Sequence, residues 1–131
     1  METDVLVALA SRTDRHHGEA RRLLERLTAV KLSPYSLVEL DLLIASQCLR
    51  VRLPDFYSAL EGVLAYYGVE DLRPRPAHFE AAWGFRRRYG LTFFDSLHAA
   101  AAVKEGEVLV SYDEGYRAVE ELEYRHPAST L

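Results

Sequence analysis

The stretch Leu91-Thr92-Phe93-Phe94-Asp95-Ser96-Leu97-His98-Ala99-Ala100-Ala101-Ala102 decides how this sequence is interpreted. Asp95 stands at the start of a predicted helix whose following side chains are so small that it must pack closely against a neighbour. Aromatic residues precede the aspartate, and a strand is predicted at residues 108–110. A carboxylate in this position is either a helix cap or part of a metal site, depending on whether other carboxylates converge on it.

The length and composition predict one globular domain, residues 1–131. The chain has 131 residues, 49% hydrophobic and 27% charged, which is enough to bury a single core. No apolar run reaches the ~20 residues of a membrane helix, and no signal peptide opens the sequence. The single cysteine, Cys48, has no partner for an intrachain disulfide, which favours a reducing cytoplasm. The net charge of −4 excludes a globally basic nucleic-acid binder but allows a local basic patch.

Strands and helices are predicted to alternate along the chain. The predicted strands cover residues 3–9, 30–32, 69–72 and 107–110, and a turn at 111–115 leads to a last short helix and strand. The predicted helices cover residues 17–28, 33–50, 53–67 and 76–90, and one more begins near Asp95. Such alternation predicts an α/β fold with a mostly parallel central sheet, flanked by helices on both faces.

Two of the predicted helices have a notable apolar pattern. The helix at 33–50 has Pro34 at a suitable first helical position and is apolar nearly all round, so we expect it to be central. The helix at 53–67 carries five apolar or aromatic residues at helical spacing: Phe56, Leu60, Val63, Leu64 and Tyr67.

Carboxylates recur near the predicted strand ends, where functional groups of open α/β sheets lie. Glu2 and Asp4 share one face of the predicted first strand, because side chains alternate along a strand. Asp95 begins its helix, and Asp113 follows the last main strand by three residues. Glu39 lies inside an apolar helix, where a carboxylate is costly unless it is paired, hydrogen-bonded or bound to a metal.

Several of these residues also have a purely structural explanation. Thr92 and Asp95 match the two ends of a capping box, and Ser111 and Glu114 fit the same pattern. Either carboxylate would then only satisfy backbone groups at a helix start.

Two further residues are ambiguous in the sequence. Glu39 is not distinguished from Asp41, which has an equally apolar set of helical neighbours. His98 comes one turn after Asp95, and a histidine there is more often packed or hydrogen-bonded than bound to a metal.

Taken in order, four segments resemble the PIN-domain nucleases, particularly the small VapC-type toxins of toxin–antitoxin pairs. The segments are residues 2–9, 36–40, 91–100 and 108–113, so that the resemblance covers almost the entire chain. The family usually has aspartate at the first acidic position, which aligns with Glu2, while Asp4 takes a small polar position. Either one fits as the first ligand. The apolar residues that normally precede this acid are missing here, so the first strand is expected to be short.

The resemblance implies an endoribonuclease, a hydrolase that cuts RNA phosphodiester bonds with Mg²⁺ or Mn²⁺. At an effective dielectric constant of about 20, two carboxylates about 4 Å apart repel by about 4 kcal/mol, so four together would be strongly destabilising or partly protonated without a cation. Oxygen ligands in that number suit Mg²⁺ or Mn²⁺ rather than zinc. The expected metal ligands are Asp95, Asp113 and Glu2 or Asp4.

Catalytic roles are expected for Glu39, Asp95 and Asp113. Glu39 would bind metal or orient the attacking water, and the bound ions would activate that water and neutralise charge on the phosphate. Ser111 is expected to support a ligand carboxylate by a hydrogen bond.

Substrate and partner surfaces are less sharply indicated. Arg86, Arg87 and Arg88 end the helix before the Asp95 stretch, where they either contact RNA phosphates or favourably terminate the helix. The resemblance also implies an antitoxin partner and a homodimer. The tyrosine-rich segment from Phe56 to Tyr67 fits such a surface, and it fits a core equally well.

Two other functions compete with a nuclease. A catalytically weak PIN-like module would bind RNA or a protein partner without cleavage, and Glu2 and the short first strand favour it. A phosphoacceptor receiver-type domain also gathers acids at strand ends, but it needs a lysine after the last main strand, where Ser111-Tyr112-Asp113 stands.

Overall fold

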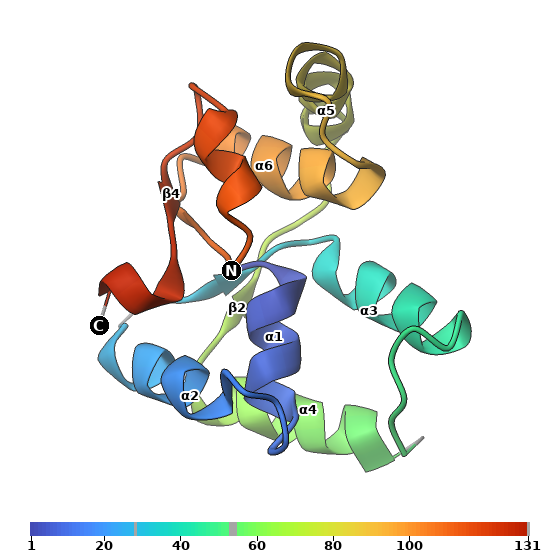
Figure 1. The fold of residues 1–131 in the computed structure, drawn as a ribbon, viewed down its shortest axis with the longest axis vertical. Coiled ribbons are helices and arrows are strands. Elements are labelled where there is room, and N and C mark those ends of the chain that lie inside the picture. The colour runs from blue at the N-terminus through green and yellow to red at the C-terminus, as the bar shows by residue number, and fades with distance from the viewer. Residues whose placement is uncertain (28, 53–54, 131) are drawn as a thin grey trace.

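The computed structural model describes residues 1–27, 29–52 and 55–130 of the chain. Its helices are α1 (Thr3–Ala10), α2 (His17–Arg26), α3 (Ser36–Ala45), α4 (Asp55–Tyr66), α5 (Pro76–Tyr89) and α6 (Phe93–Glu105), with short 3₁₀ helices η1 (Glu114–Ala118) and η2 (Pro127–Thr130). Its strands are β1 (Lys31–Leu32), β2 (Glu70–Asp71), β3 (Leu109–Val110) and β4 (Tyr124–Arg125). In Figure 1 the strands lie between α5 and α6 at one end and α1, α2 and α4 at the other.

The strands form two parallel pairs that the start of the chain connects. β1 pairs with β2, and β3 pairs with β4. Between them, the Met1 nitrogen donates to the Lys31 carbonyl at 2.7 Å and the Met1 carbonyl accepts from the Ser33 N–H at 3.1 Å. On the other side, the Glu2 N–H donates to the Val110 carbonyl at 3.1 Å. The order β2, β1, Met1–Glu2, β3, β4 confirms the predicted α/β fold with parallel strands, although each assigned strand has only two residues.

The first predicted strand is wrong, because residues 3–10 form helix α1. Glu2 has extended backbone and caps the helix through a hydrogen bond that its side chain accepts from the Asp4 N–H, at 3.2 Å. The buried residues of α1 include Val5, Leu6 and Leu9, which share one helical face. The β-branched valines favoured a strand, but the capped start and this spacing favour a helix. Only the extended Met1–Glu2 segment lies where the predicted strand would be.

Helix α3 differs from the prediction in length and in burial. It begins at Ser36 instead of placing Pro34 in its first turn, and it ends at Ala45. Leu37, Val38 and Leu42 are 43%, 63% and 55% exposed, so the helix is not central. Apolar residues lie on all sides of α3, and one of its apolar faces has no packing partner among the described residues.

The other predicted elements agree well with the structure. Strands at 30–32, 69–72 and 107–110 are confirmed in shortened form, as are the helices at 17–28, 53–67 and 76–90 and the helix that starts near Asp95. Thr28, Leu53 and Pro54, which the predictions included, lie outside the described residues. The predicted face of α4 also packs as expected, with Leu60 buried and the other four members of the set partly buried against the same core.

Two hydrophobic clusters hold the fold together on either side of the strands. The first joins α1, α2 and α4, with Leu6, Leu23 and Leu60 among its buried residues. The second joins α5 and α6, where the alanines of α6 let Phe85 of α5 approach closely. Gly90 ends α5 in the left-handed conformation (φ 67°), and the chain then turns back into α6. Among the described residues, no helix is both long and apolar enough to cross a membrane.

Candidate metal centre

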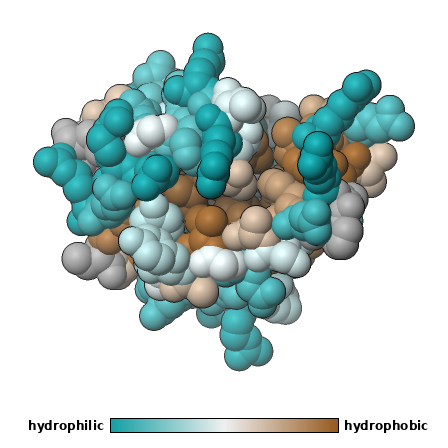
Figure 2. Space-filling view, turned by 90° about the horizontal axis from the view of Figure 1, so that it is seen from below, coloured by the Kyte–Doolittle hydropathy of each residue, from teal (hydrophilic) through white to brown (hydrophobic). Residues whose placement is uncertain are grey.

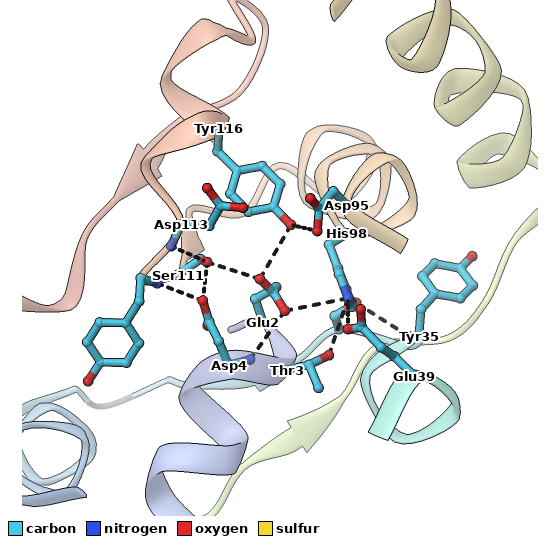
Figure 3. Close-up of polar contacts among 12 residues, drawn as sticks. Glu2, Thr3, Asp4, Tyr35, Glu39, Asp95, His98, Ser111, Asp113 and Tyr116 are labelled. Carbon is cyan, nitrogen blue, oxygen red and sulfur yellow. Dashed lines mark hydrogen bonds and ion pairs between the residues drawn. The ribbon is translucent and has the colours of Figure 1, made fainter. Parts of the chain in front are cut away.

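The predicted acidic residues gather where the two hydrophobic clusters meet. Glu2 lies at the centre of the group in Figure 3, with Asp4 and Ser111 on one side and Glu39 and His98 on the other. Glu2 caps α1, Asp4 lies in its first turn, Glu39 belongs to α3, and His98 belongs to α6. The centre therefore draws on both clusters, which position it between them.

Glu2 is the most buried carboxylate of the group, with 6% of its surface exposed. Its Oε2 lies 3.0 Å from the Ser111 hydroxyl and 3.4 Å from the Tyr116 hydroxyl. Burial raises the pKa of Glu2 to about 7, and the negative charges of Asp4 and Glu39 act in the same direction. Near neutral pH this carboxyl is therefore poised to give up a proton to a solvent base when a cation binds.

Asp4 lies beside Glu2 because Ser111 holds both. The Ser111 hydroxyl is 2.6 Å from Asp4 Oδ2, which also accepts the Tyr112 N–H at 2.9 Å. Burial raises the pKa of Asp4, although these two hydrogen bonds lower it in part. The other oxygen, Oδ1, is buried and has no hydrogen-bond partner among the described residues. The proximity of Glu2 and Asp4 was predicted, but for the wrong reason, since they occupy a helix start and not alternate positions of a strand.

The two contacts of Ser111 have a chemical consequence. A hydroxyl carries one hydrogen, so it cannot donate to Glu2 and Asp4 at the same time. The shorter contact assigns the hydrogen to Asp4, and the Glu2 contact then requires a proton on the Glu2 carboxyl or a cation between the groups. The raised pKa of Glu2 fits the first condition in the metal-free protein.

Glu39 is joined to the centre by His98. Its Oε1 lies 2.9 Å from His98 Nε2, and the ring is fully buried. Burial alone would raise the pKa of Glu39, but hydrogen bonds to His98 and Thr3 hold that pKa below its usual value. Asp41, which the sequence did not separate from Glu39, is exposed and accepts a hydrogen bond from Tyr57.

Asp95 contributes from the first turn of α6. Its Oδ1 accepts the Tyr116 hydroxyl at 3.1 Å, and Tyr116 also reaches Glu2. Thr92 is the N-cap residue of α6, but its side chain makes no capping hydrogen bond, so the alternative interpretation of Asp95 as part of a capping box is not supported. Burial raises the pKa of the Tyr116 hydroxyl, which therefore keeps its single hydrogen. The Asp95 oxygen is the nearer acceptor for that hydrogen and the Glu2 oxygen the farther one.

Asp113 lies at the rim of the centre. It is exposed, and its Oδ1 accepts the Gly115 N–H at 2.8 Å, so Asp113 caps η1. The helix cap predicted at this turn is therefore formed by Asp113 and not by the predicted pair Ser111 and Glu114. The Asp113 N–H donates to the Ser111 hydroxyl at 3.0 Å. Ser111 in turn contacts Glu2 and Asp4, so the Asp113 residue is linked to these two carboxylates through Ser111.

The donor set fits a divalent cation. Oxygen or nitrogen atoms of Glu2, Glu39 and His98 lie within 4.8 Å of one another, and Asp4 and Asp95 are linked to Glu2 through single hydroxyl groups. Among the described residues, no lysine or arginine forms an ion pair with any of these carboxylates. The unpaired Asp4 Oδ1 is a further oxygen available for a ligand. A mainly carboxylate set of this kind suits Mg²⁺ or Mn²⁺.

The three consecutive arginines do different things. Arg86 donates to the Ser96 hydroxyl at 2.7 Å and lies over the rings of Trp83 and Phe93. Arg88 forms an ion pair with Glu121 at 2.8 Å. Arg87 is exposed to solvent and remains the most accessible of the three for a phosphate.

Sequence reasoning assigned no role to Thr3 or Tyr116, and it named His98 as a packed or hydrogen-bonded histidine, which the structure confirms. For His98 a signal was present, because it follows Asp95 by one helical turn and so points to the same side of α6. For Tyr116 there was none, since its contact with Asp95 depends on how the segment after β3 folds back.

Comparisons with known proteins agree with the family resemblance of the sequence. The sequence matches the profile of the family described as "PIN domain" over residues 1–122. The fold is similar to a chain in the crystal structure of VapBC2 from Rickettsia felis bound to a DNA fragment from their promoter, with a TM-score of 0.71 and 18% sequence identity. That match covers 95% of this chain and 94% of the other. A comparison with curated proteins finds no match.

Proposed function

Because the chain belongs to the PIN-domain family, we propose that it is a metal-dependent endoribonuclease and the toxin of a toxin–antitoxin pair. One observation carries this proposal: four carboxylates meet at a largely buried centre, and no lysine or arginine in the described part of the chain forms an ion pair with them. Such a group is destabilising unless it is protonated or binds a cation. A carboxylate centre of this kind is suited to hydrolysis of a phosphodiester.

The proposed cation is Mg²⁺ or Mn²⁺, held by Glu2, Asp4, Asp95 and Asp113. The buried position of Glu2 and the free oxygen of Asp4 support both as ligands. Asp113 would have to turn from its capping contact toward Ser111. When bound, the ion lowers the pKa of water and neutralises charge on the phosphate oxygens.

The chain's own residues would supply orientation and proton transfer. The lowered pKa of Glu39 keeps this carboxylate ionised, so it can accept the proton of an attacking water. Asp95 and Asp113 would share the catalytic role by holding the proposed ions. The Ser111 and Tyr116 hydroxyls fix the orientation of Glu2, Asp4 and Asp95.

RNA is the proposed substrate, and Arg87 is the best placed of Arg86, Arg87 and Arg88 to contact its backbone. A net charge of −4 would otherwise repel a polyanion, so local cations must bring the phosphate to the acidic centre. Arg86 and Arg88 would contribute mainly by holding the surrounding side chains in place.

Two apolar surfaces support the proposed protein partners. Exposed apolar residues of α3, α5 and the start of α6 would form a homodimer interface: Leu37, Val38, Leu42, Phe79, Trp83 and Phe93. A groove along α4, lined by Tyr57, Leu60 and Leu64, would accept the antitoxin. Figure 2 shows apolar side chains gathered around a hollow on the face toward α2 and α4, with hydrophilic side chains around them. The exposed Cys48 thiol is consistent with a cytoplasmic protein.

The test is cleavage of a mixed structured RNA by purified protein with Mn²⁺, Mg²⁺ or EDTA. We expect metal-dependent cleavage that falls at least about a hundredfold in Asp95→Asn, since a ligand carboxylate is lost. Asp41→Asn is the matched control, because Asp41 is an exposed acid of α3 outside the centre, and it should cleave like the wild type. Equal cleavage by the wild type and Asp95→Asn would mean contamination. Metal binding without cleavage would instead favour the PIN-like binding module.

A further inference from the structure

We propose that His98 is the positioning residue for Glu39: its Nε2–H donates to the Glu39 carboxylate, and Ser33 selects the ring tautomer that makes this possible. This inference rests on the proposed function, because it assigns the device that aims the catalytic carboxylate. It does not make His98 a metal ligand, although its Nε2 lies within reach of the same space.

The contacts of Ser33 allow His98 Nδ1 to accept a hydrogen bond. The Ser33 hydroxyl is 2.6 Å from His98 Nδ1, and it already accepts the Tyr35 N–H at 3.4 Å. Its own hydrogen is then free to be donated to Nδ1. A neutral imidazole has one N–H and one acceptor nitrogen, so an Nδ1 that accepts leaves the proton on Nε2.

The surroundings of Nε2 require a donor. Nε2 lies 2.9 Å from Glu39 Oε1, 3.3 Å from Thr3 Oγ1 and 3.8 Å from Glu2 Oε1. An unprotonated nitrogen would face two carboxylate oxygens with its lone pair, which is unfavourable in a buried site. With the proton on Nε2, the closest contact becomes a charge-assisted hydrogen bond to Glu39. No lone pair then remains at this atom for a cation.

A second histidine of the same chain shows the same arrangement with less ambiguity. His78 Nδ1 receives the Arg75 backbone N–H at 3.3 Å and contacts the Tyr35 hydroxyl at 2.8 Å, and Nε2 lies 2.9 Å from Glu105 Oε1. A backbone N–H can only donate, so Nδ1 of His78 is an acceptor and Nε2 is the donor to the glutamate. Tyr35 is two residues from Ser33, so one short turn fixes both rings.

The experiment compares cleavage kinetics and ring tautomers. His98→Leu, which has no donor, should lower kcat about a hundredfold with KM within about threefold. His98→Gln places an amide N–H near the Nε2 position and should recover at least a tenth of the wild-type kcat. Ser33→Ala should fall between the two. Tyr35→Phe is the matched control, because it removes the equivalent hydroxyl contact at His78, and it should lower the melting temperature while kcat stays within about twofold.

Nitrogen-15 NMR of metal-free wild type provides a readout that does not depend on cleavage. We expect the ring proton of His98 to be on Nε2. A ring proton on Nδ1 instead of Nε2 would overturn the proposal even if the enzyme is active. A His98→Gln variant as slow as His98→Leu, or one whose Mn²⁺ affinity falls tenfold or more, would also overturn it. If the wild type does not cleave RNA, the proposed function fails, and the tautomer still decides the contact between His98 and Glu39.

Discussion

His98 and His78 make the same pair of contacts in opposite electrostatic surroundings. Both rings are fully buried, both direct Nδ1 to a hydroxyl of the turn at residues 33–35, and both direct Nε2 to a glutamate at 2.9 Å. Beside His78, Glu105 also forms an ion pair with Arg75 at 2.9 Å. Beside His98, the neighbouring charge is another carboxylate, Glu2.

The difference indicates which of the two clusters is suited to bind the proposed cation. Around His78 the charges are balanced within the chain, and the pKa of Glu105 is lowered mainly by its hydrogen bond to His78, with Arg75 adding to the effect. Around His98 the charges are not balanced, and burial raises the pKa of Glu2 to about 7. A bound cation would balance the charges of the second cluster. The hydrogen-bond geometry of the two histidines alone does not distinguish the two clusters.

The largest expected effect comes from neutralising the glutamate of each cluster. Glu39→Gln should reduce metal-dependent RNA cleavage at least about a hundredfold, because an amide cannot accept the proton of the attacking water. Glu105→Gln should leave cleavage within about twofold and only lower the melting temperature, since Glu105 belongs to the balanced cluster. Single-turnover cleavage with Mn²⁺ measures the first effect, and thermal unfolding measures the second. Comparable loss of activity in both variants would remove the distinction between the clusters.

The next effect is on stability as a function of pH without metal. The pKa of Glu2 in the folded protein is above its unfolded value, so protonation favours folding. Protonation of Glu2 contributes about 3 kcal/mol to the free energy of unfolding. This contribution is fully present below about pH 4.5 and is lost as the pH rises through about 7. Glu2→Gln should remove this part of the pH dependence and make the metal-free protein more stable at pH 8. Urea unfolding from pH 5 to pH 8 measures it.

Mn²⁺ provides the control for this pH dependence. A bound cation stabilises the ionised form of Glu2, so saturating metal should flatten the wild-type curve between pH 5 and pH 8. A wild-type protein whose stability rises with pH in the absence of metal would show that Glu2 is not the group that titrates.

The elements around the balanced cluster were easier to predict than those around the acidic centre. Helices α5 and α6 follow from local signals: Pro76 at a helix start, Gly90 at a helix end and the small side chains after Asp95. Helix α1 was taken for a strand because a run of apolar residues with two valines fits either structure over so short a length. Its capping by Glu2 is the feature that decides, and a glutamate is not a common N-cap residue.

The residues of the centre were predicted to different degrees for a physical reason. Glu2, Asp4 and Asp95 stand at element starts, where sequence position implies a common edge, and the structure brings them together. The choice between Glu39 and Asp41 depends on which side of α3 faces α6, and that is tertiary information. The contacts of His98, with residues 65 and 59 positions away, could not be read from local spacing.

The smallest expected effect comes from removing the cation that balances the His78 cluster. Arg75→Gln would leave Glu105 with His78, in the same situation as Glu39 with His98, yet Arg75 is 48% exposed at its side chain and solvent screens its charge. We expect the melting temperature to fall by no more than about 2 °C, with cleavage unchanged. Arg73→Gln, which changes a nearby charge, should have no measurable effect, and calorimetry in low salt is the suitable measurement. A large loss of stability in Arg75→Gln would mean that charge balance is as critical at His78 as at the acidic centre, and the contrast between the two histidines would then be one of degree.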